Sequence, residues 1–426
     1  SQAADQSLAA HAQNPTAWRV KIQAAMKQGD LKAGSEHYQA WYKLRGSHDR
    51  VAFRGMAMTV LWQAMQVPSP EAKARAIQIV ERHQLEELSD SVSDLLVHDD
   101  DLVAAAAAVA LLTSDFSAPR IATELLRSGN AKARAMVVKG IAKKVGRASR
   151  ADIVPALNDP DVTVRRSAVD AIGRWKHKDD AKLLHESARL DKDPQVRSRS
   201  LRALISMGPS EGVVQLATRA LDDSYLGSRV AAVALLGKYG GDSAQAQLQT
   251  LAESSDFPVA LRAATALFKR SGLDQLAVVQ RAYASADWMT RSTALNTVAS
   301  ATTRDSALAF AGRGMADTRL EVRLTAARLL LKLGVVEPAL KAFREALGAD
   351  QLSPRLIAAT DLARRDDPDA INLLSRMAQT GPRKQREAAF AAHRAAGIVT
   401  TGLVAGLGDT NIEVRLTAAD MVVSLR

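Results

Sequence analysis

Asp159-Pro160-Asp161-Val162-Thr163-Val164-Arg165 is the clearest copy of a pattern that recurs along the chain and from which the fold class follows. It is typical of a helix start, because Asp caps a helix N-terminus and Pro fits the first turn. The interval from this Arg to the next copy is 29 to 33 residues throughout the chain, and a return this regular predicts an internal repeat. The copies are Arg134, Arg165, Arg197, Arg229, Arg262, Arg291, Arg323, Arg355, Arg386 and Arg415.

Other positions keep step with this Arg. A small residue follows three positions later and an aliphatic residue seven positions later, which predicts one apolar stripe with a point where a neighbouring helix approaches closely. The small residues are Ala168, Ser200, Ala232, Ala294, Ala326, Ala358, Ala389 and Ala418. Six positions before the Arg, an Asp recurs at Asp159, Asp191, Asp223, Asp256, Asp317 and Asp409.

This pattern of Asp, Val-Arg, Ala and Leu in a two-helix unit resembles the HEAT repeat, particularly the short bacterial kind also seen in phycobilisome-linked lyase subunits. The resemblance implies that each Asp and Arg join neighbouring units through a ladder of hydrogen bonds. Residues 349–380 and 381–408 lack the Asp, so we expect the ladder to be interrupted there.

Amphipathic helical periodicity continues past residue 15, without a βαβ rhythm. We predict an all-α, right-handed α-solenoid of about twelve HEAT-type helical hairpins over residues 67–426, with the last repeat incomplete. Arg75 begins a similar unit, and Ala104 takes the Arg position of the next one.

Residues 1–66 are predicted to form an N-terminal helical cap. Trp18, Gly29-Asp30, Gly34 and Tyr38 loosely resemble the spacing of one tetratricopeptide repeat. We expect the aromatic rings to bury the first hydrophobic face of the solenoid, and Val67-Pro68-Ser69-Pro70 to form the junction.

At the other end, residues 409–426 supply one helix of a repeat without its partner. Met421, Val422, Val423 and Leu425 would then form an open apolar face, although terminal repeats usually need a polar outer face. We expect this open C-terminal face either to fray or to be covered, by self-association or by a partner.

The composition excludes several classes of chemistry. The 426 residues include no Cys, which removes disulfides, thiolate catalysis, Cys-based zinc sites and iron–sulfur clusters. No apolar run is long enough for a transmembrane segment. The missing Cys and the first residue, Ser rather than Met, favour a bacterial periplasmic or other extracytoplasmic location, with the cytoplasm left open.

Enzyme motifs are scarce. Gly208-Pro209-Ser210-Glu211-Gly212 matches G-x-S-x-G, but that motif needs a strand entering a helix, and here we expect a turn between two helices. His residues do not occur in pairs four apart, and His185-Glu186 is a single His-Glu dipeptide, whereas one iron enzyme family of similar repeats uses several. We therefore predict no catalytic residue, cofactor or metal site.

The charge is uneven. Lys and Arg number 57 against 46 Asp and Glu, and the run 127–150 holds eight basic residues and no acidic one. A candidate patch for an anionic partner is Lys132, Lys139, Lys143, Lys144, Arg147 and Arg150. The alternative is a solvated basic face that serves solubility.

The function that follows is a non-enzymatic protein–protein interaction scaffold, whose concave surface, made from the second helix of each unit, binds one or more protein partners. Two alternatives stay open. One is nucleic-acid or other polyanion binding through the basic patch, which would depend steeply on salt. The other is a lyase-type enzyme subunit.

Overall fold

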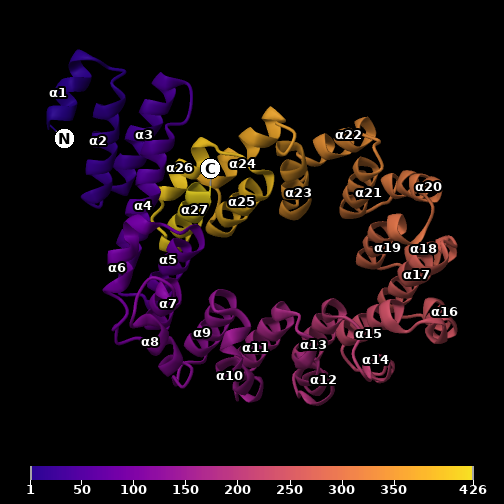
Figure 1. Ribbon diagram of the computed structural model, residues 1–426. Coiled ribbons are helices and arrows are strands. Elements are labelled where there is room, and N and C mark those ends of the chain that lie inside the picture. Colours follow the sequence, from indigo (N-terminus) through magenta and orange to yellow (C-terminus); the bar gives the residue numbers. More distant parts are fainter. Residues whose placement is uncertain (1, 425–426) are drawn as a thin grey trace. The chain divides into compact units, whose positions relative to one another are not determined.

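The computed structural model describes residues 2–424, and every regular element in that range is a helix (Figure 1). The predicted all-α solenoid class is therefore confirmed. The chain divides into two compact units: unit 1 combines Ser1–Leu125 with Leu347–Arg426, and unit 2 is Leu126–Ala346. The boundary between residues 66 and 67 stays a prediction from sequence pattern; the compact units divide the chain elsewhere.

Unit 2 is an array of helical hairpins in two layers. Its longer, odd-numbered helices contain the repeated Arg, and the even-numbered helices between them are shorter. The helices are α9 (Ala131–Lys144), α10 (Arg150–Ile153), α11 (Val162–Trp175), α12 (Ala181–Leu190), α13 (Pro194–Met207), α14 (Val213–Ala220), α15 (Leu226–Tyr239), α16 (Gln245–Glu253), α17 (Phe257–Ser271), α18 (Leu276–Tyr283), α19 (Trp288–Ala301), α20 (Arg304–Met315), α21 (Leu320–Lys332) and α22 (Glu337–Ala346).

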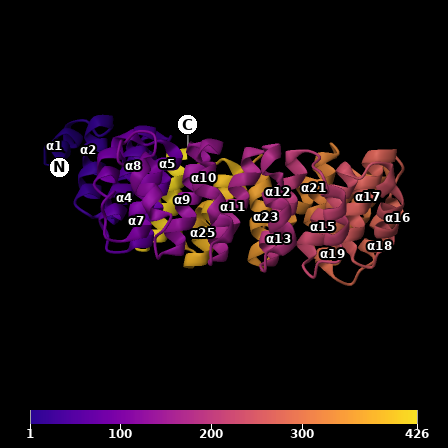
Figure 2. The same cartoon turned by 60° about the horizontal axis from the view of Figure 1, so that its bottom comes forward.

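The odd-numbered helices form the inner layer of unit 2. Each packs against the next odd-numbered helix from α9 to α21. Figure 1 shows them on the inside of the curve of this unit, and Figure 2 shows α9, α11, α13 and α15 following one another along it. Close packing is possible because small residues meet: a Cβ added to Gly173 or Gly237 would lie 2.6 Å from the Cβ of Ala203 or Ala266 on the next inner helix. The expectation that the second helices make the inner surface is wrong, because the first helices, which contain the repeated Arg, lie on the inside of the curve (Figure 1).

The predicted ladder joins successive inner helices. Arg197 donates from Nε and Nη2 to the two carboxylate oxygens of Asp223 at 2.7 and 2.9 Å, and from Nη1 to the carbonyl of Asp191 at 2.9 Å. This pairing ties one repeat to the next through side chains that are mostly buried. The same pairing joins Arg134 to Asp159, Arg165 to Asp191, Arg229 to Asp256 and Arg291 to Asp317.

Arg262 does not belong to the ladder, contrary to the sequence expectation. In the other inner helices of unit 2 the ladder Arg is the fourth residue after the N-cap, but in α17 the N-cap is Asp256 and that position is Ala260, fully buried. Arg262 lies two residues further on and is exposed. The unequal intervals of 33 and 29 residues on either side of Arg262 become 31 and 31 when Ala260 is taken instead.

Unit 1 contains helices from both ends of the chain. They are α1 (Gln2–Ala10), α2 (Pro15–Lys27), α3 (Leu31–Arg45), α4 (Arg50–Gln66), α5 (Pro70–His83), α6 (Ser89–Ser93), α7 (Asp101–Leu111), α8 (Ala118–Leu125), α23 (Leu352–Ala363), α24 (Pro368–Thr380), α25 (Arg383–Ala396), α26 (Thr401–Leu407) and α27 (Ile412–Ser424). The expected junction is a turn in which Ser69 caps α5. The predicted burial of the N-terminal rings holds for Tyr38 and Trp41, at 0% and 3% exposed, but not for Trp62 at 43%.

The expected open C-terminal face is covered by the chain itself. α27 packs against α4 and α5, and α26 packs against α3 and α4. Met421, Val422 and Val423 are consequently only 2%, 4% and 8% exposed, so within the described residues this face is not available for self-association or for a partner. Leu425 lies outside the described residues. Sequence periodicity could not show this, because the covering helices come from the opposite end of the chain.

Charged groups fix this junction inside unit 1. Asp420, 6% exposed, accepts hydrogen bonds from Arg82 at 2.7 Å, from His83 Nε2 at 2.7 Å, and from Arg394. Burial would raise the pKa of Asp420, but the bonds from His83 and Arg394 hold it below its ordinary value. Arg75, expected to begin a repeat, binds Glu413 and Thr417 of α27 instead.

The interruption expected near residues 349–408 is confirmed at Arg355. Its Nε is buried and has no hydrogen-bond partner among the described residues, because the following repeat offers no Asp. Arg386, by contrast, forms an ion pair with Asp409, and its Nη2 donates to Asp409 Oδ1 at 3.1 Å. The ladder in unit 1 is therefore discontinuous.

Candidate binding surface

The six residues of the predicted basic patch divide into two groups. Lys132, Lys139 and Lys143 are exposed on α9, whereas Lys144 is less exposed and lies about 100° round the helix from Lys143. Arg147 and Arg150 lie beyond the C-terminus of α9 and bind Asp180. Only the lysines of the patch therefore lie on α9.

Asp180 takes up the charge of Arg147 and Arg150. Its carboxylate is fully buried and accepts from Arg147 Nε at 2.9 Å and from Arg150 Nε at 2.6 Å. Burial alone would raise the pKa of Asp180, but these two bonds hold it below its ordinary value. The two arginines thus stabilise a buried carboxylate and do not belong to the candidate surface.

The three exposed lysines of α9 belong to a longer pattern on unit 2. We call the position of the ladder Arg in each inner helix, or of Ala260 in α17, the ladder position. Residues two before the ladder position and two, five and nine after it lie within about 60° of each other around an α-helix. Nine exposed Lys and Arg occupy these positions along the inner helices. They form the basic stripe: Lys132, Lys139, Lys143, Arg174, Arg202, Lys238, Arg262, Lys269 and Lys332.

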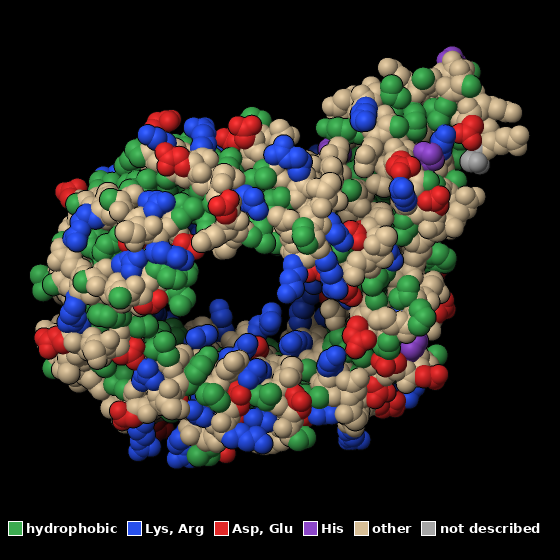
Figure 3. All heavy atoms as spheres, turned by 180° about the vertical axis from the view of Figure 1, so that it is seen from behind, with side chains coloured by type: hydrophobic (Ala, Val, Ile, Leu, Met, Phe, Trp, Pro, Cys, Tyr) green, Lys and Arg blue, Asp and Glu red, His purple; other side chains and the backbone are tan. Residues whose placement is uncertain are grey.

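Acidic groups are almost missing from the same positions. Among the residues of the inner helices α9 to α21, each exposed charged side chain is a Lys or an Arg. Asp170 and Glu321 lie on the stripe face but are less exposed and paired, Asp170 with Arg199 at 2.7 Å and Glu321 with Arg319 at 3.2 Å. The exposed charges of the inner helices are therefore all positive. Figure 3 shows Lys and Arg side chains along part of this edge of unit 2.

The outer layer differs. Its exposed charged residues are mixed in sign, and several of opposite sign are neighbours. The cations are Lys182, Arg189, Arg219, Arg281, Arg304, Arg313, Lys341 and Arg344, and the anions are Asp152, Glu186, Glu253, Asp305, Glu337 and Glu345. Most of the excess positive charge on the helices of unit 2 is thus carried by the inner face.

Helix stability explains only part of the basic stripe. Cations in the last turn of a helix interact favourably with the helix dipole, which accounts for the positions of Lys143, Arg174, Lys238, Lys269 and Lys332. Lys139 and Arg202, however, lie in the middle of their helices, where clustered like charge opposes folding. An accumulation of charge that does not stabilise the fold indicates an interaction surface.

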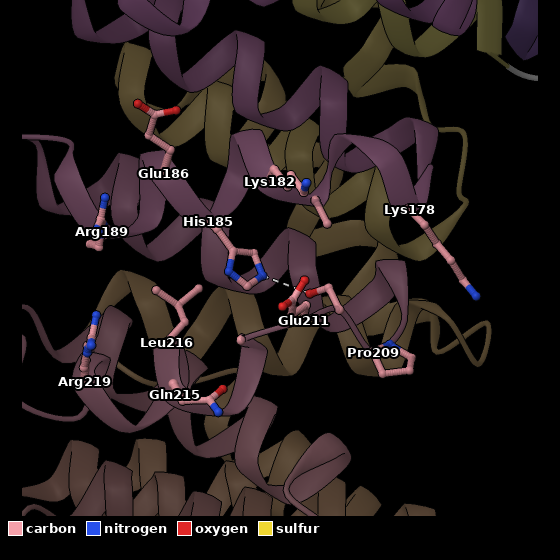
Figure 4. A pocket seen from close by; sticks show the side chains of 13 residues that line it. Lys178, Lys182, His185, Glu186, Arg189, Pro209, Glu211, Gln215, Leu216 and Arg219 are labelled. Atoms are coloured by element: carbon pink, nitrogen blue, oxygen red, sulfur yellow. Dashed lines mark hydrogen bonds between the residues drawn. The ribbon is translucent and has the colours of Figure 1, made fainter.

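The outer layer contains a hollow of about 550 Å³ between α12 and α14 (Figure 4). His185 Nε2 and Ser210 Oγ are 2.9 Å apart at its base, and burial lowers the pKa of His185. Ser210 lies in the turn between α13 and α14, as expected for a G-x-S-x-G string that is not a nucleophile elbow. Glu186 points away from His185 in Figure 4, and within the described residues His185 Nδ1 has no carboxylate partner.

Two further structural features bear on function. Across residues 2–424, groups of three or more His, Asp or Glu suited to a metal ion do not occur. None of the helices described has the length and apolar character needed to cross a bilayer.

Residues 118–205 match the family model for HEAT repeats. No curated protein matches the chain. Similar solved structures include the CpcE–CpcF complex of phycocyanin lyase from Nostoc sp. PCC7120, at 18% identity and a TM-score of 0.36 over 53% of this chain and 92% of that one.

Two more solved structures are similar to this chain. Human deoxyhypusine hydroxylase is 16% identical with a TM-score of 0.30, over 60% of this chain and 99% of that one. Kap121p is 14% identical with a TM-score of 0.39, over 88% of this chain and 48% of that one. At these values the similarity does not extend beyond a general arrangement of helices.

Proposed function

We propose that this chain, a solenoid that carries HEAT repeats, is a non-enzymatic binding scaffold and that the inner layer of unit 2 holds its partner. One observation carries the proposal: each exposed charged side chain on the inner helices α9 to α21 is cationic, whereas the outer helices carry both signs. A surface whose exposed charges all have one sign favours one kind of macromolecular partner.

The sign of the charge specifies the partner further. A basic surface raises the local concentration of anions and accelerates their encounter. The partner is therefore anionic where it meets the inner layer. The protein partner predicted from the sequence would then be an acidic protein, and a polyanion is the second class of partner.

Matched charge reversals test which face binds. The inner variant combines Lys139→Glu, Arg202→Glu and Arg262→Glu, three exposed residues without an ion pair. The outer variant combines Lys182→Glu, Arg219→Glu and Lys341→Glu, which are also exposed and without an ion pair. Both variants change the net charge by the same amount within unit 2.

Wild type and the two variants are immobilised and exposed to extract of the native host, and retained protein and nucleic acid are both analysed. We expect macromolecules that are retained by wild type and by the outer variant but lost from the inner variant. Equal retention by the inner variant and wild type, with loss from the outer variant, would contradict the proposal.

A further inference from the structure

We infer that the basic stripe binds the phosphate backbone of duplex nucleic acid, without reading its sequence. This inference rests on the proposed function, because it names the partner of the same inner surface. It goes further in assigning the cations of six of the seven inner helices α9 to α21, rather than those of the run 127–150, to one ligand.

The stripe has suitable dimensions for a duplex backbone. Helices that pack side by side are about 8 to 10 Å apart, so α9 to α21 extend over about 50 to 60 Å. Duplex DNA carries one negative charge per about 1.7 Å of its axis, or about 30 charges over that length. Phosphates therefore outnumber the nine cations of the stripe.

The neutral side chains on the same face also suit phosphate. Gln195 and Asn296 are exposed at stripe positions, two before and five after the ladder Arg. Amide side chains commonly donate hydrogen bonds to phosphate oxygens, and such contacts position a duplex without specifying its sequence. The stripe thus combines charge with a smaller number of neutral donors.

An acidic protein is a poorer match. The cores of protein interfaces are depleted of charged residues and contain buried aromatic or aliphatic anchors. On the inner helices of unit 2, the large apolar side chains with substantial exposure are Leu226 at 39% and Met289 at 59%. Nine exposed cations with so few apolar anchors favour a ligand that is charged along its whole length.

Single-stranded nucleic acid is also disfavoured. Proteins that bind single strands stack the bases on exposed aromatic rings. The aromatic residues of the inner helices are only partly exposed, and two are held by backbone carbonyls: Trp175 donates to Ala142 at 3.4 Å and Tyr239 donates to Ile205 at 2.7 Å. The face lacks a stacking platform, so the phosphate backbone of a duplex is the better match.

Fluorescence anisotropy with a labelled 24-base-pair DNA duplex tests the inference over 50 to 300 mM NaCl. With six or more phosphate contacts, the logarithm of affinity should fall against the logarithm of salt with a slope of about −5 or steeper. The inner variant lacks three of these contacts, so its affinity for the duplex should be lower than that of wild type on the order of 100-fold at 0.1 M salt, and its slope smaller by about three. The outer variant should change affinity by less than about fivefold, because its charges are screened beyond about 10 Å.

Several results would overturn the inference. These are a slope near zero, equal losses in the two variants, tighter binding of a single strand than of the duplex, or displacement of the duplex by a poly-glutamate chain at equal charge concentration. Circular dichroism at 222 nm checks that each variant keeps its helices. If the inner variant loses the native partner but wild type does not bind the duplex, the inner surface remains the binding site and only the duplex is refuted.

Discussion

Replacing Arg197 by Ala should destabilise unit 2 far more than replacing Arg202 by Ala. Arg197 makes a two-point contact with Asp223 and also donates to the carbonyls of Asp191 and Lys192, at 2.9 and 3.4 Å. Its side chain is 18% exposed and that of Asp223 is 10% exposed. Arg202 is exposed on the inner face and makes no ion pair.

The magnitude follows from what each substitution leaves behind. Without Arg197, Asp223 keeps its charge in a mostly buried position, and breaking a buried pair costs about 3 to 5 kcal/mol. Allowing for partial exposure, we expect a loss of about 3 kcal/mol for Arg197→Ala. Arg202→Ala should change the free energy of unfolding by less than about 0.5 kcal/mol, as is usual for a surface substitution.

Urea denaturation followed by circular dichroism compares the two variants, and amide hydrogen exchange in α13 and α15 gives a local measure. The local measure matters because repeat arrays are stabilised by nearest-neighbour contacts and need not unfold in one step. Equal midpoints and equal exchange for the two variants would refute the ladder as the source of stability.

The same contact predicts a pH dependence. The hydrogen bond from Arg197, opposed by burial, holds the pKa of Asp223 below its ordinary value of 3.8. A carboxylate with a lowered folded-state pKa stabilises the protein above the unfolded-state pKa, and this stabilisation is lost as pH falls through the folded-state pKa. The difference between wild type and Arg197→Ala should therefore be full at pH 6 and shrink below about pH 3.8; a constant difference down to pH 2 would contradict it.

Three further predictions concern packing and the ladder register. Asp420→Asn should speed amide exchange in α27 and cost about 3 kcal/mol, because it removes the charge that Arg82, His83 and Arg394 share; unchanged exchange would show that apolar packing alone holds α27. Gly173→Ala should destabilise by about 1 to 3 kcal/mol through its contact with Ala203, whereas Gly312→Ala, with open space around it, should stabilise by up to about 1 kcal/mol, as thermal unfolding can show. Arg262→Ala should leave the urea midpoint within about 0.5 kcal/mol of wild type, and a loss as large as that of Arg197→Ala would place Arg262 in the ladder after all.

The sequence was sufficient to predict the fold class and the ladder because both depend on local, repeated spacing. Arg197 and Asp223, for example, are 26 residues apart, within one repeat length of each other. The Arg pattern predicts Arg262 for the ladder because it is an Arg near the expected position, whereas the buried Ala260 is the residue that preserves the interval.

The basic stripe was predicted only in part. Lys132, Lys139 and Lys143 can be predicted because they cluster in the sequence, whereas Arg174, Lys238 and Lys332 occur one per repeat and do not cluster. The signal that could have found them is a fixed offset of nine residues from the ladder position. The pairing of Arg147 and Arg150 with Asp180 could not be predicted. Asp180 belongs to the next repeat and is not one of the Asp residues that recur six positions before the Arg.

Lysine footprinting tests most directly whether the inner layer of unit 2 is the binding surface. The protein is acetylated with and without the 24-base-pair duplex, and each lysine is quantified by mass spectrometry. Lys139 and Lys269, exposed on inner helices, should lose most of their reactivity when the duplex is bound, while Lys182 and Lys341, exposed on outer helices, should keep theirs. Protection of Lys182 and Lys341 with Lys139 and Lys269 unchanged would contradict the assignment of the inner layer as the binding surface.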